Sequence, residues 1–194
     1  MSTVETMITV VLPDGSEKSV AKGSTAGDLA KSIAQGLFRK AVGAVINGEI
    51  RDLAAPINDQ DKIKILTADD TESYELLRHS TAHVMAQAVQ RIFPQAKIAI
   101  GPTIQDGFYY DFEIPDHPLL PEDLEKIEAE MKKIAQEDQK LVRYDIPDVD
   151  KQIDEFRAQG EKFKAELLTE HRDHNPTLYL MQDKEGKTIW NDLC

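Results

Sequence analysis

Strand and helix signals follow one another in a fixed order through residues 1–66, and this order restricts the fold more than any other feature of the sequence. A β-branched run from Met7 to Leu12 predicts a strand, and Pro13-Asp14-Gly15 predicts the turn that returns the chain over residues 16–20. Ser24 or Thr25 then provides the N-cap of a helix. This helix is expected to turn three apolar side chains toward a core, those of Leu29, Ala30 and Ile33.

The same unit closes with further strands. Residues 42–46 predict one strand, and Asn47-Gly48 is a strong signal for a two-residue turn that leads back over residues 49–53. Residues 62–66 predict the last strand. This order predicts a β-grasp fold, one sheet crossed by one helix, in a chain of the α+β class. The unit holds no His, no Cys and no phosphate loop, which favours a small binding or spacer module.

Charge is distributed unevenly and supports two domains, residues 1–66 and 67–194. The first holds 8 basic and 8 acidic residues, whereas the second holds 15 basic and 27 acidic residues and so carries the whole net charge of −12. Such an acidic chain does not bind nucleic acid through bulk charge. Any contact with RNA is therefore expected at a local site.

Three features bear on the compartment. No apolar run approaches the roughly 18 residues that a membrane-spanning helix needs, so no membrane partner is expected. Residues 1–6 show no secretory signal. The single cysteine excludes an internal disulfide and fits a reducing compartment, which predicts a cytoplasmic protein.

The second unit begins with a long predicted helix, Ser73 to Phe93, that carries two histidines one turn apart. Its apolar stripe runs from Leu77 to Ile92, and His79 and His83 fall roughly opposite this stripe, beside Ala86 and Gln90. The i, i+4 spacing makes the two rings neighbours. They could be packed or solvated structural residues, or part of a site.

The rest of the unit alternates strand and helix signals. Strands are predicted at Lys97–Ile100 and Phe108–Ile114, with a turn at Asp106-Gly107. Pro121 and Pro147 each open a helix, so residues 121–160 are expected to form a solvated helical layer. A final hairpin is predicted from Thr177–Met181 and Lys187–Asn191, shortly before Cys194.

The histidine pair leaves three interpretations open. His79, His83 and a thiolate from Cys194 could bind zinc, although Ser80 stands where a metalloprotease has its general-base Glu. The pair could instead belong to a metal-free hydrolytic site that positions water and an ester carbonyl. The third interpretation is purely structural, and the spacing alone does not decide among them.

Longer stretches of the sequence add a family resemblance. Residues 77–86 (LRHSTAHVMA), 97–102 (KIAIGP), 106–111 (DGFYYD) and 192–194 (DLC) resemble the amino-terminal half of bacterial-type threonyl-tRNA synthetase. Residues 1–66, with LPDG at 12–15 and VING at 45–48, are similar to its leading TGS domain, a β-grasp module. The resemblance implies that residues 67–194 form an α+β editing domain, the second additional domain, of the kind shared with alanyl-tRNA synthetase.

The resemblance implies a proofreading activity. The editing domain of the family hydrolyses seryl-tRNA(Thr), so the expected partner is the 3′ end of tRNA(Thr) carrying a seryl ester. Serine lacks one methyl group of threonine, which is worth only about 1–3 kcal/mol of discrimination, so a second, hydrolytic site is needed.

The resemblance also implies the site residues. His79 and His83 match the family's HxxxH, Asp192 and Cys194 match the start of its terminal motif, and Lys164 matches its lysine. His79 and Lys164 would place the water and the ester, Asp192 would hold the serine amino group, and His83 and Cys194 would shape the pocket. No metal is expected here, with His79, His83 and Cys194 as the alternative zinc ligands.

The resemblance ends at Cys194, before the last histidine of the family's CxxxH motif. We therefore expect an editing domain that is incomplete at its C-terminus and weakly active or inactive. The family uses ATP, magnesium and zinc in a catalytic core that is absent here. The full-length enzyme is expected to form a homodimer, and the interface of that dimer also belongs to the missing core. Two alternatives stay open: a non-catalytic TGS-type RNA-binding module, and a zinc-dependent hydrolase like the alanyl-tRNA editing domain.

Overall fold

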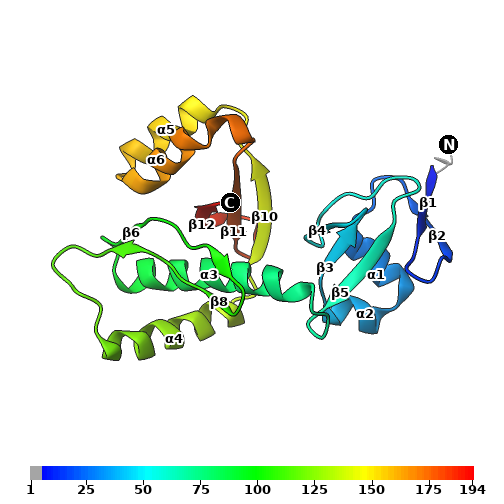
Figure 1. Ribbon diagram of the computed structural model, residues 1–194, viewed down its shortest axis with the longest axis horizontal. Helices are drawn as coiled ribbons and strands as arrows, with labels where there is room; N and C mark the ends of the chain where they lie inside the picture. Colours follow the sequence, from blue (N-terminus) through cyan, green and yellow to red (C-terminus); the bar gives the residue numbers. More distant parts are fainter. Residues whose placement is uncertain (1–5) are drawn as a thin grey trace. The chain divides into compact units, whose positions relative to one another are not determined.

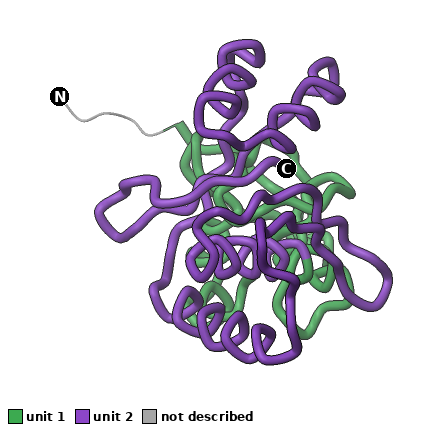
Figure 2. The backbone as a smooth tube through the Cα atoms, turned by 90° about the vertical axis from the view of Figure 1, so that its left-hand side faces the viewer, with its two compact units in different colours: residues 1–78 green, residues 79–194 purple. Residues whose placement is uncertain are grey.

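The computed structural model describes residues 6–194 (Figure 1). The chain divides into two compact units, residues 1–78 and 79–194 (Figure 2). The division falls inside helix α3 (Ser73–Ile92), whose predicted extent is confirmed. The domain boundary expected after residue 66 stays a prediction. The first five residues of the expected first domain, where no secretory signal is predicted, lie outside the described residues.

The first unit has the predicted β-grasp order, with one additional helix. Strands β1 and β2 form an antiparallel hairpin, and β3 lies between β4 and β5. A parallel bridge between Val11 and Lys62 places β1 beside the start of β5. Its elements are β1 (Met7–Val11), β2 (Glu17–Ala21), α1 (Ala26–Ile33), α2 (Gln35–Lys40), β3 (Ala41–Ile46), β4 (Glu49–Arg51) and β5 (Ile63–Thr67).

Helix α1 packs on this sheet from a defined start. Thr25 is the N-cap: its hydroxyl accepts the Asp28 backbone N–H at 3.1 Å, and the Asp28 carboxylate accepts the Thr25 N–H at 3.0 Å. Leu29 is fully buried in the core, as predicted. The prediction for Ile33 is wrong, because this last residue of α1 lies outside the core cluster and is exposed.

The second unit combines helices with a three-stranded antiparallel sheet in the order β10-β11-β12. The predicted final hairpin is confirmed as β11 and β12. After α3 its elements are β6 (Lys97–Ile98), β7 (Thr103–Ile104), β8 (Gly107–Phe108), β9 (Phe112–Glu113), α4 (Pro121–Gln136), β10 (Lys140–Asp145), α5 (Val149–Ala158), α6 (Lys162–Glu170), the 3₁₀ turn η1 (Arg172–His174), β11 (Thr177–Gln182) and β12 (Thr188–Leu193).

Two predictions for this unit are wrong. The strand expected at Phe108–Ile114 is interrupted between β8 and β9, where Asp111 N–H donates to the Ile100 carbonyl at 2.9 Å. The helical layer expected over residues 121–160 contains strand β10, which pairs along its whole length with β11. Because β10 is mostly exposed and rich in polar residues, it lacks the apolar alternation by which strands are recognised.

Helix α3 is covered on two sides (Figure 1). On one side Ala88 and Val89 pack against Ile127 and Ile134 of α4. On the other side, polar residues of α3 contact β12, and His83 is only 4% exposed. This excludes a solvated surface position for His83.

None of the helices within residues 6–194 combines the length and hydropathy of a membrane span.

Candidate active site

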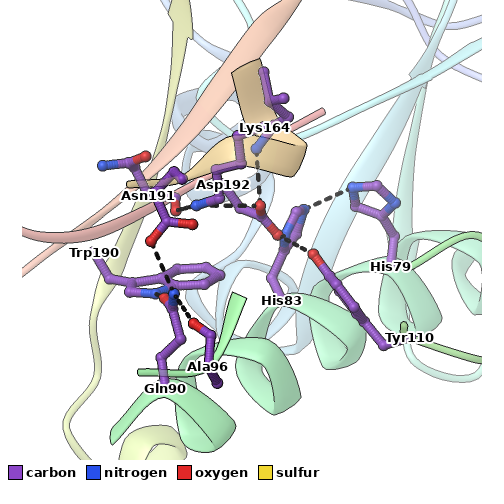
Figure 3. A network of polar contacts seen from close by, with 11 residues as sticks. His79, His83, Gln90, Ala96, Tyr110, Lys164, Trp190, Asn191 and Asp192 are labelled. Atoms are coloured by element: carbon purple, nitrogen blue, oxygen red, sulfur yellow. Dashed lines mark hydrogen bonds and ion pairs between the residues drawn. The ribbon is translucent and has the colours of Figure 1, made fainter. Parts of the chain in front are cut away.

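Four of the five residues predicted for the site, His79, His83, Lys164 and Asp192, meet in one place (Figure 3), and Cys194 lies beside His79. His79 and His83 lie on α3, Lys164 lies on α6, and Asp192 lies on β12, with Cys194 directly after it. Helix spacing places the two histidines together, whereas the remaining contacts depend on tertiary folding. The structure thus brings together all five residues.

Asp192 is the charged centre of the cluster and is only 3% exposed. Its Oδ2 accepts a hydrogen bond from His83 Nδ1 at 2.9 Å and one from the Tyr110 hydroxyl at 2.5 Å. Its Oδ1 accepts the Leu193 N–H at 3.0 Å and lies 3.5 Å from Lys164 Nζ. Four donors therefore surround one buried carboxylate, which satisfies the requirement that buried charges be paired.

His79 connects this centre to Cys194. The Nε2 atoms of His79 and His83 are 2.8 Å apart, and His79 Nε2 lies 3.1 Å from Cys194 Sγ. A single ring nitrogen either accepts a hydrogen bond or donates one, so His79 Nε2 cannot accept from His83 and donate to the sulfur at once. The protonation of the neighbouring groups decides between the two arrangements.

Charge couples His83 to Cys194. Burial lowers the pKa of His83, but hydrogen bonds and negative charge from Asp192 and Cys194 outweigh it and raise the pKa to about 9. Partial burial raises the pKa of Cys194, but hydrogen bonds from His79 and His83 outweigh it and lower the pKa to about 6. At neutral pH these shifts favour an imidazolium at His83 and a thiolate at Cys194, on either side of His79.

Lys164 is buried, with 3% exposure, and lies on the other side of Asp192. Its ammonium donates to the Asn191 carbonyl at 2.7 Å, and it lies 5.1 Å from the ring centre of Trp190. Burial opposes ionisation of Asp192, yet hydrogen bonding to His83 and the charge of Lys164 together hold the pKa of Asp192 below its usual value. The carboxylate is thus ionised at neutral pH.

A cavity of about 490 Å³ opens beside this cluster. His79, His83, Tyr110, Asp192 and Cys194 line it. The other lining residues are mainly apolar or small, with two further histidines: Ala82, Ala99, Ile100, Gly101, Pro102, Thr103, Leu167, Leu168, His171, His174, Asn175, Pro176 and Leu193. Small apolar walls around a few polar groups are typical of a site for a small ligand.

Tyr110 belongs to the site but was not predicted as a site residue. Its ring packs directly against Gly101, where a Cβ atom would overlap the ring, and its hydroxyl reaches Asp192. Burial and the charge of Asp192 raise the pKa of Tyr110, so it is a neutral donor. The absence of a side chain at Gly101 therefore makes room for the Tyr110 ring.

His79, His83 and Cys194 also meet the first requirement of a metal site. One ligand atom from each lies within 4.8 Å of the others. Tetrahedral zinc with bonds of roughly 2.0–2.3 Å keeps its ligand atoms about 3.3–3.6 Å apart. The separations of 2.8 Å and 3.1 Å are about 0.5 Å shorter than that and fit direct hydrogen bonds better.

Comparison with known proteins finds relatives that cover both units of the chain. Residues 8–67 match the TGS domain family. The chain is 44% identical over 187 residues to Threonine--tRNA ligase of Citrifermentans bemidjiense, a match that covers 96% of this chain and 28% of the relative. It is 46% identical over 164 residues to the enzyme of that name from Clostridioides difficile, covering 84% of this chain and 25% of the relative.

A third relative, Threonine--tRNA ligase of Geobacillus kaustophilus, is 41% identical over 189 residues, 97% of this chain and 28% of the relative. The chain thus spans about a quarter of the length of the curated relatives it matches. It contains a TGS domain and is related over nearly its whole length to the amino-terminal region of bacterial threonine--tRNA ligases.

Proposed function

We propose that the pocket of the second unit hydrolyses the ester bond of seryl-tRNA(Thr) and so proofreads threonyl-tRNA synthesis. The observation that carries this proposal is that His79, His83, Asp192 and Cys194 line one cavity, while Lys164 lies against Asp192 without lining it. Relatedness to threonine--tRNA ligases supports tRNA as the partner. The net charge of −12 makes a local RNA contact at the pocket mouth more favourable than a broad one.

The charge of Asp192 suits the ammonium group of an aminoacyl ester. Both of its oxygens already accept contacts, so a bound ammonium has to replace one of the donors. Tyr110 is the neutral side-chain donor among them, and its replacement leaves both buried cations, His83 and Lys164, in place. Asp192 therefore both binds the substrate and orients the groups around it.

Hydrolysis needs a group that takes a proton from the attacking water. A water entering between His79 and His83 would accept the N–H of His83 and donate to the freed Nε2 of His79. His79 then takes the proton as the water oxygen bonds to the ester carbonyl carbon. The bond from that carbon to the ribose oxygen breaks, and the ribose oxygen leaves as a hydroxyl with the proton that His79 took from the water.

A second candidate is a zinc-dependent aminoacyl-ester hydrolase, which the three convergent ligand atoms of His79, His83 and Cys194 favour. It requires the rings and the sulfur to move about 0.5 Å apart. Metal analysis of the purified chain distinguishes the two. Stoichiometric zinc, with activity lost to a chelator, would support the metal-dependent reaction, and chelator-resistant hydrolysis supports the metal-free one.

The proposal is tested by the hydrolysis of seryl-tRNA(Thr) with the protein in excess, so that even a slow single turnover is measurable. We expect His79→Ala to lower the rate about 100-fold or more, as loss of a proton-transfer group does. His117→Ala is the matched control, because His117 pairs with Asp123 and does not line the pocket. Binding of tRNA(Thr) without any ester hydrolysis would instead support a non-catalytic RNA-binding module.

A further inference from the structure

A second polar network lies behind the pocket and joins α3 to β12 (Figure 3). The Trp190 indole N–H donates to the side-chain oxygen of Gln90 at 2.6 Å. The amide nitrogen of Gln90 donates to the Ala96 carbonyl at 3.2 Å and to Glu161 Oε1 at 3.1 Å. The acceptor and both donor hydrogens of this amide are therefore used, and the Gln90 side chain has one orientation.

This network and the catalytic cluster are two parallel connections between the same elements. Trp190 and Asp192 lie two residues apart on β12, so their side chains project from the same face of the strand, about 7 Å apart along it. His83 and Gln90 lie seven residues apart on α3, which is two helical turns or about 10.5 Å. One pair, His83 and Asp192, carries the proposed chemistry, and the other pair fixes the strand on the helix.

Lys164 lies between the two connections. Its ammonium donates to the carbonyl of Asn191, the residue between Trp190 and Asp192, and contacts Asp192 Oδ1 at 3.5 Å. The faces of two aromatic rings lie on its other sides, Trp190 at 5.1 Å and Phe156 at 5.8 Å. A buried ammonium surrounded in this way is held by ring faces as well as by oxygen atoms.

We propose that Gln90 and Trp190 are positioning residues of the pocket. Gln90 fixes the Trp190 indole, and the indole holds the Lys164 ammonium against Asp192. Neither Gln90 nor Trp190 lines the cavity, so their effect on hydrolysis passes through Lys164 and Asp192. This inference rests on the proposed ester hydrolysis, and part of its test is independent of activity.

The activity-independent test uses fluorescence, because Trp190 is the only tryptophan of the chain. In Gln90→Leu, we expect the emission of Trp190 to shift and its quenching by acrylamide to increase, since the indole N–H loses its partner. Gln136→Leu is the matched control, an exposed glutamine at the end of α4. An unchanged emission spectrum and quenching constant in folded Gln90→Leu would overturn the inference, whatever the hydrolytic activity.

The activity test separates positioning from simple stability. For seryl-tRNA(Thr) under single-turnover conditions, we expect Gln90→Leu and Trp190→Phe each to lower the maximal rate about tenfold, while the protein concentration at half-maximal rate stays within about twofold. The double variant should be no slower than the slower single variant, because the two residues act as one unit. An unchanged maximal rate in folded Trp190→Phe, or in Gln90→Leu whose Trp190 emission has shifted, would overturn the inference.

A charge exchange provides a rescue. Gln90→Glu keeps an acceptor for the Trp190 N–H but sets a carboxylate against Glu161, and we expect it to be as slow as Gln90→Leu. Adding Glu161→Gln restores a donor opposite that carboxylate and should recover part of the maximal rate. Absence of recovery in a folded double variant would contradict the contacts proposed for Gln90. If protein that extends past Cys194 also fails to hydrolyse the ester, the proposed function fails, and fluorescence alone decides whether Gln90 holds Trp190.

Discussion

Replacing Asp192 by Asn removes the carboxylate on which the charge of the pocket depends. In the intact protein the pKa of His83 is about 9, against 6.5 for the ordinary imidazole. Burial lowers this pKa and is the largest influence, and the hydrogen bond and charge of Asp192 are the chief opposing ones. Without that charge, only Cys194 opposes the effect of burial, and we expect the pKa of His83 to fall back toward 6.5 in Asp192→Asn.

The size of the effect follows from the pKa change. A rise from 6.5 to about 9 corresponds to about 3 kcal/mol of stability for the folded protein that carries a charged His83. Because the folded-state pKa is the higher one, this stability is fully present below pH 6.5 and is lost as the pH rises through 9. Breaking the buried pair leaves His83 and Lys164 without their counter-charge, which typically costs about 3–5 kcal/mol.

The thiol of Cys194 changes how the stability of the intact protein depends on pH. Its pKa falls from 9.0 to about 6, so its contribution is present above pH 9 and is lost as the pH falls through 6. Between pH 6.5 and 9, folding transfers a proton from this thiol to His83, and the two slopes cancel. We therefore expect nearly constant stability across this range, and a stability that falls with rising pH once Cys194→Ser removes the thiol.

The assay is an NMR titration of the His83 ring proton on Cε1, followed by chemical unfolding at several pH values. The matched control is Asp123→Asn, since Asp123 is also a buried carboxylate that pairs with a histidine, His117. We expect the control to leave the titration of His83 unchanged. A midpoint that stays near 9 in Asp192→Asn would refute the assignment of the charge to this pair.

Three further predictions concern single groups. Alkylation of Cys194 by iodoacetamide should reach half its maximal rate near pH 6 in the folded chain, and nearer pH 9 after unfolding in urea. Gly101→Ala should displace the Tyr110 ring, lower the rate of ester hydrolysis and reduce the free energy of unfolding by about 1–3 kcal/mol, whereas Gly107→Ala, which has open space around it, should be neutral in both assays. Thr25→Ala should lower the free energy of unfolding of the first unit by about 0.5–2 kcal/mol, measured by chemical denaturation, without changing hydrolysis.

Local signals predicted most of the first unit. The strand, turn and cap residues there act within a few positions of one another, and Thr25 and the Asn47-Gly48 turn stand where the sequence placed them. Ile33 was misplaced because periodicity identifies the face of a helix but not how far along it the core extends. Helix α2 and strand β10 were missed because neither has a strong apolar period.

For the candidate site, helix spacing alone placed His79 beside His83. The contacts of Asp192 and Lys164 join residues far apart in the chain, and only the family resemblance suggested that they belong together. Helix periodicity placed Gln90 on the same face of α3 as the histidines, but it could not show that Trp190, on a distant strand, donates a hydrogen bond to Gln90. Tyr110 lies in an aromatic run that was expected to form a regular strand. Its hydroxyl instead donates to Asp192, a contact between residues far apart in the chain that local sequence patterns do not indicate.

The proofreading function is tested most directly by comparing two esters of the same tRNA. Seryl-tRNA(Thr) and threonyl-tRNA(Thr) are each incubated with excess protein, and the single-turnover rates are measured side by side. One methyl group separates the esters, so exclusion of the larger one should make hydrolysis of the seryl ester about 10-fold to 200-fold faster. Equal rates for the two esters, or no hydrolysis of the seryl ester by folded protein that extends past Cys194 and binds the tRNA, would contradict the proposed function.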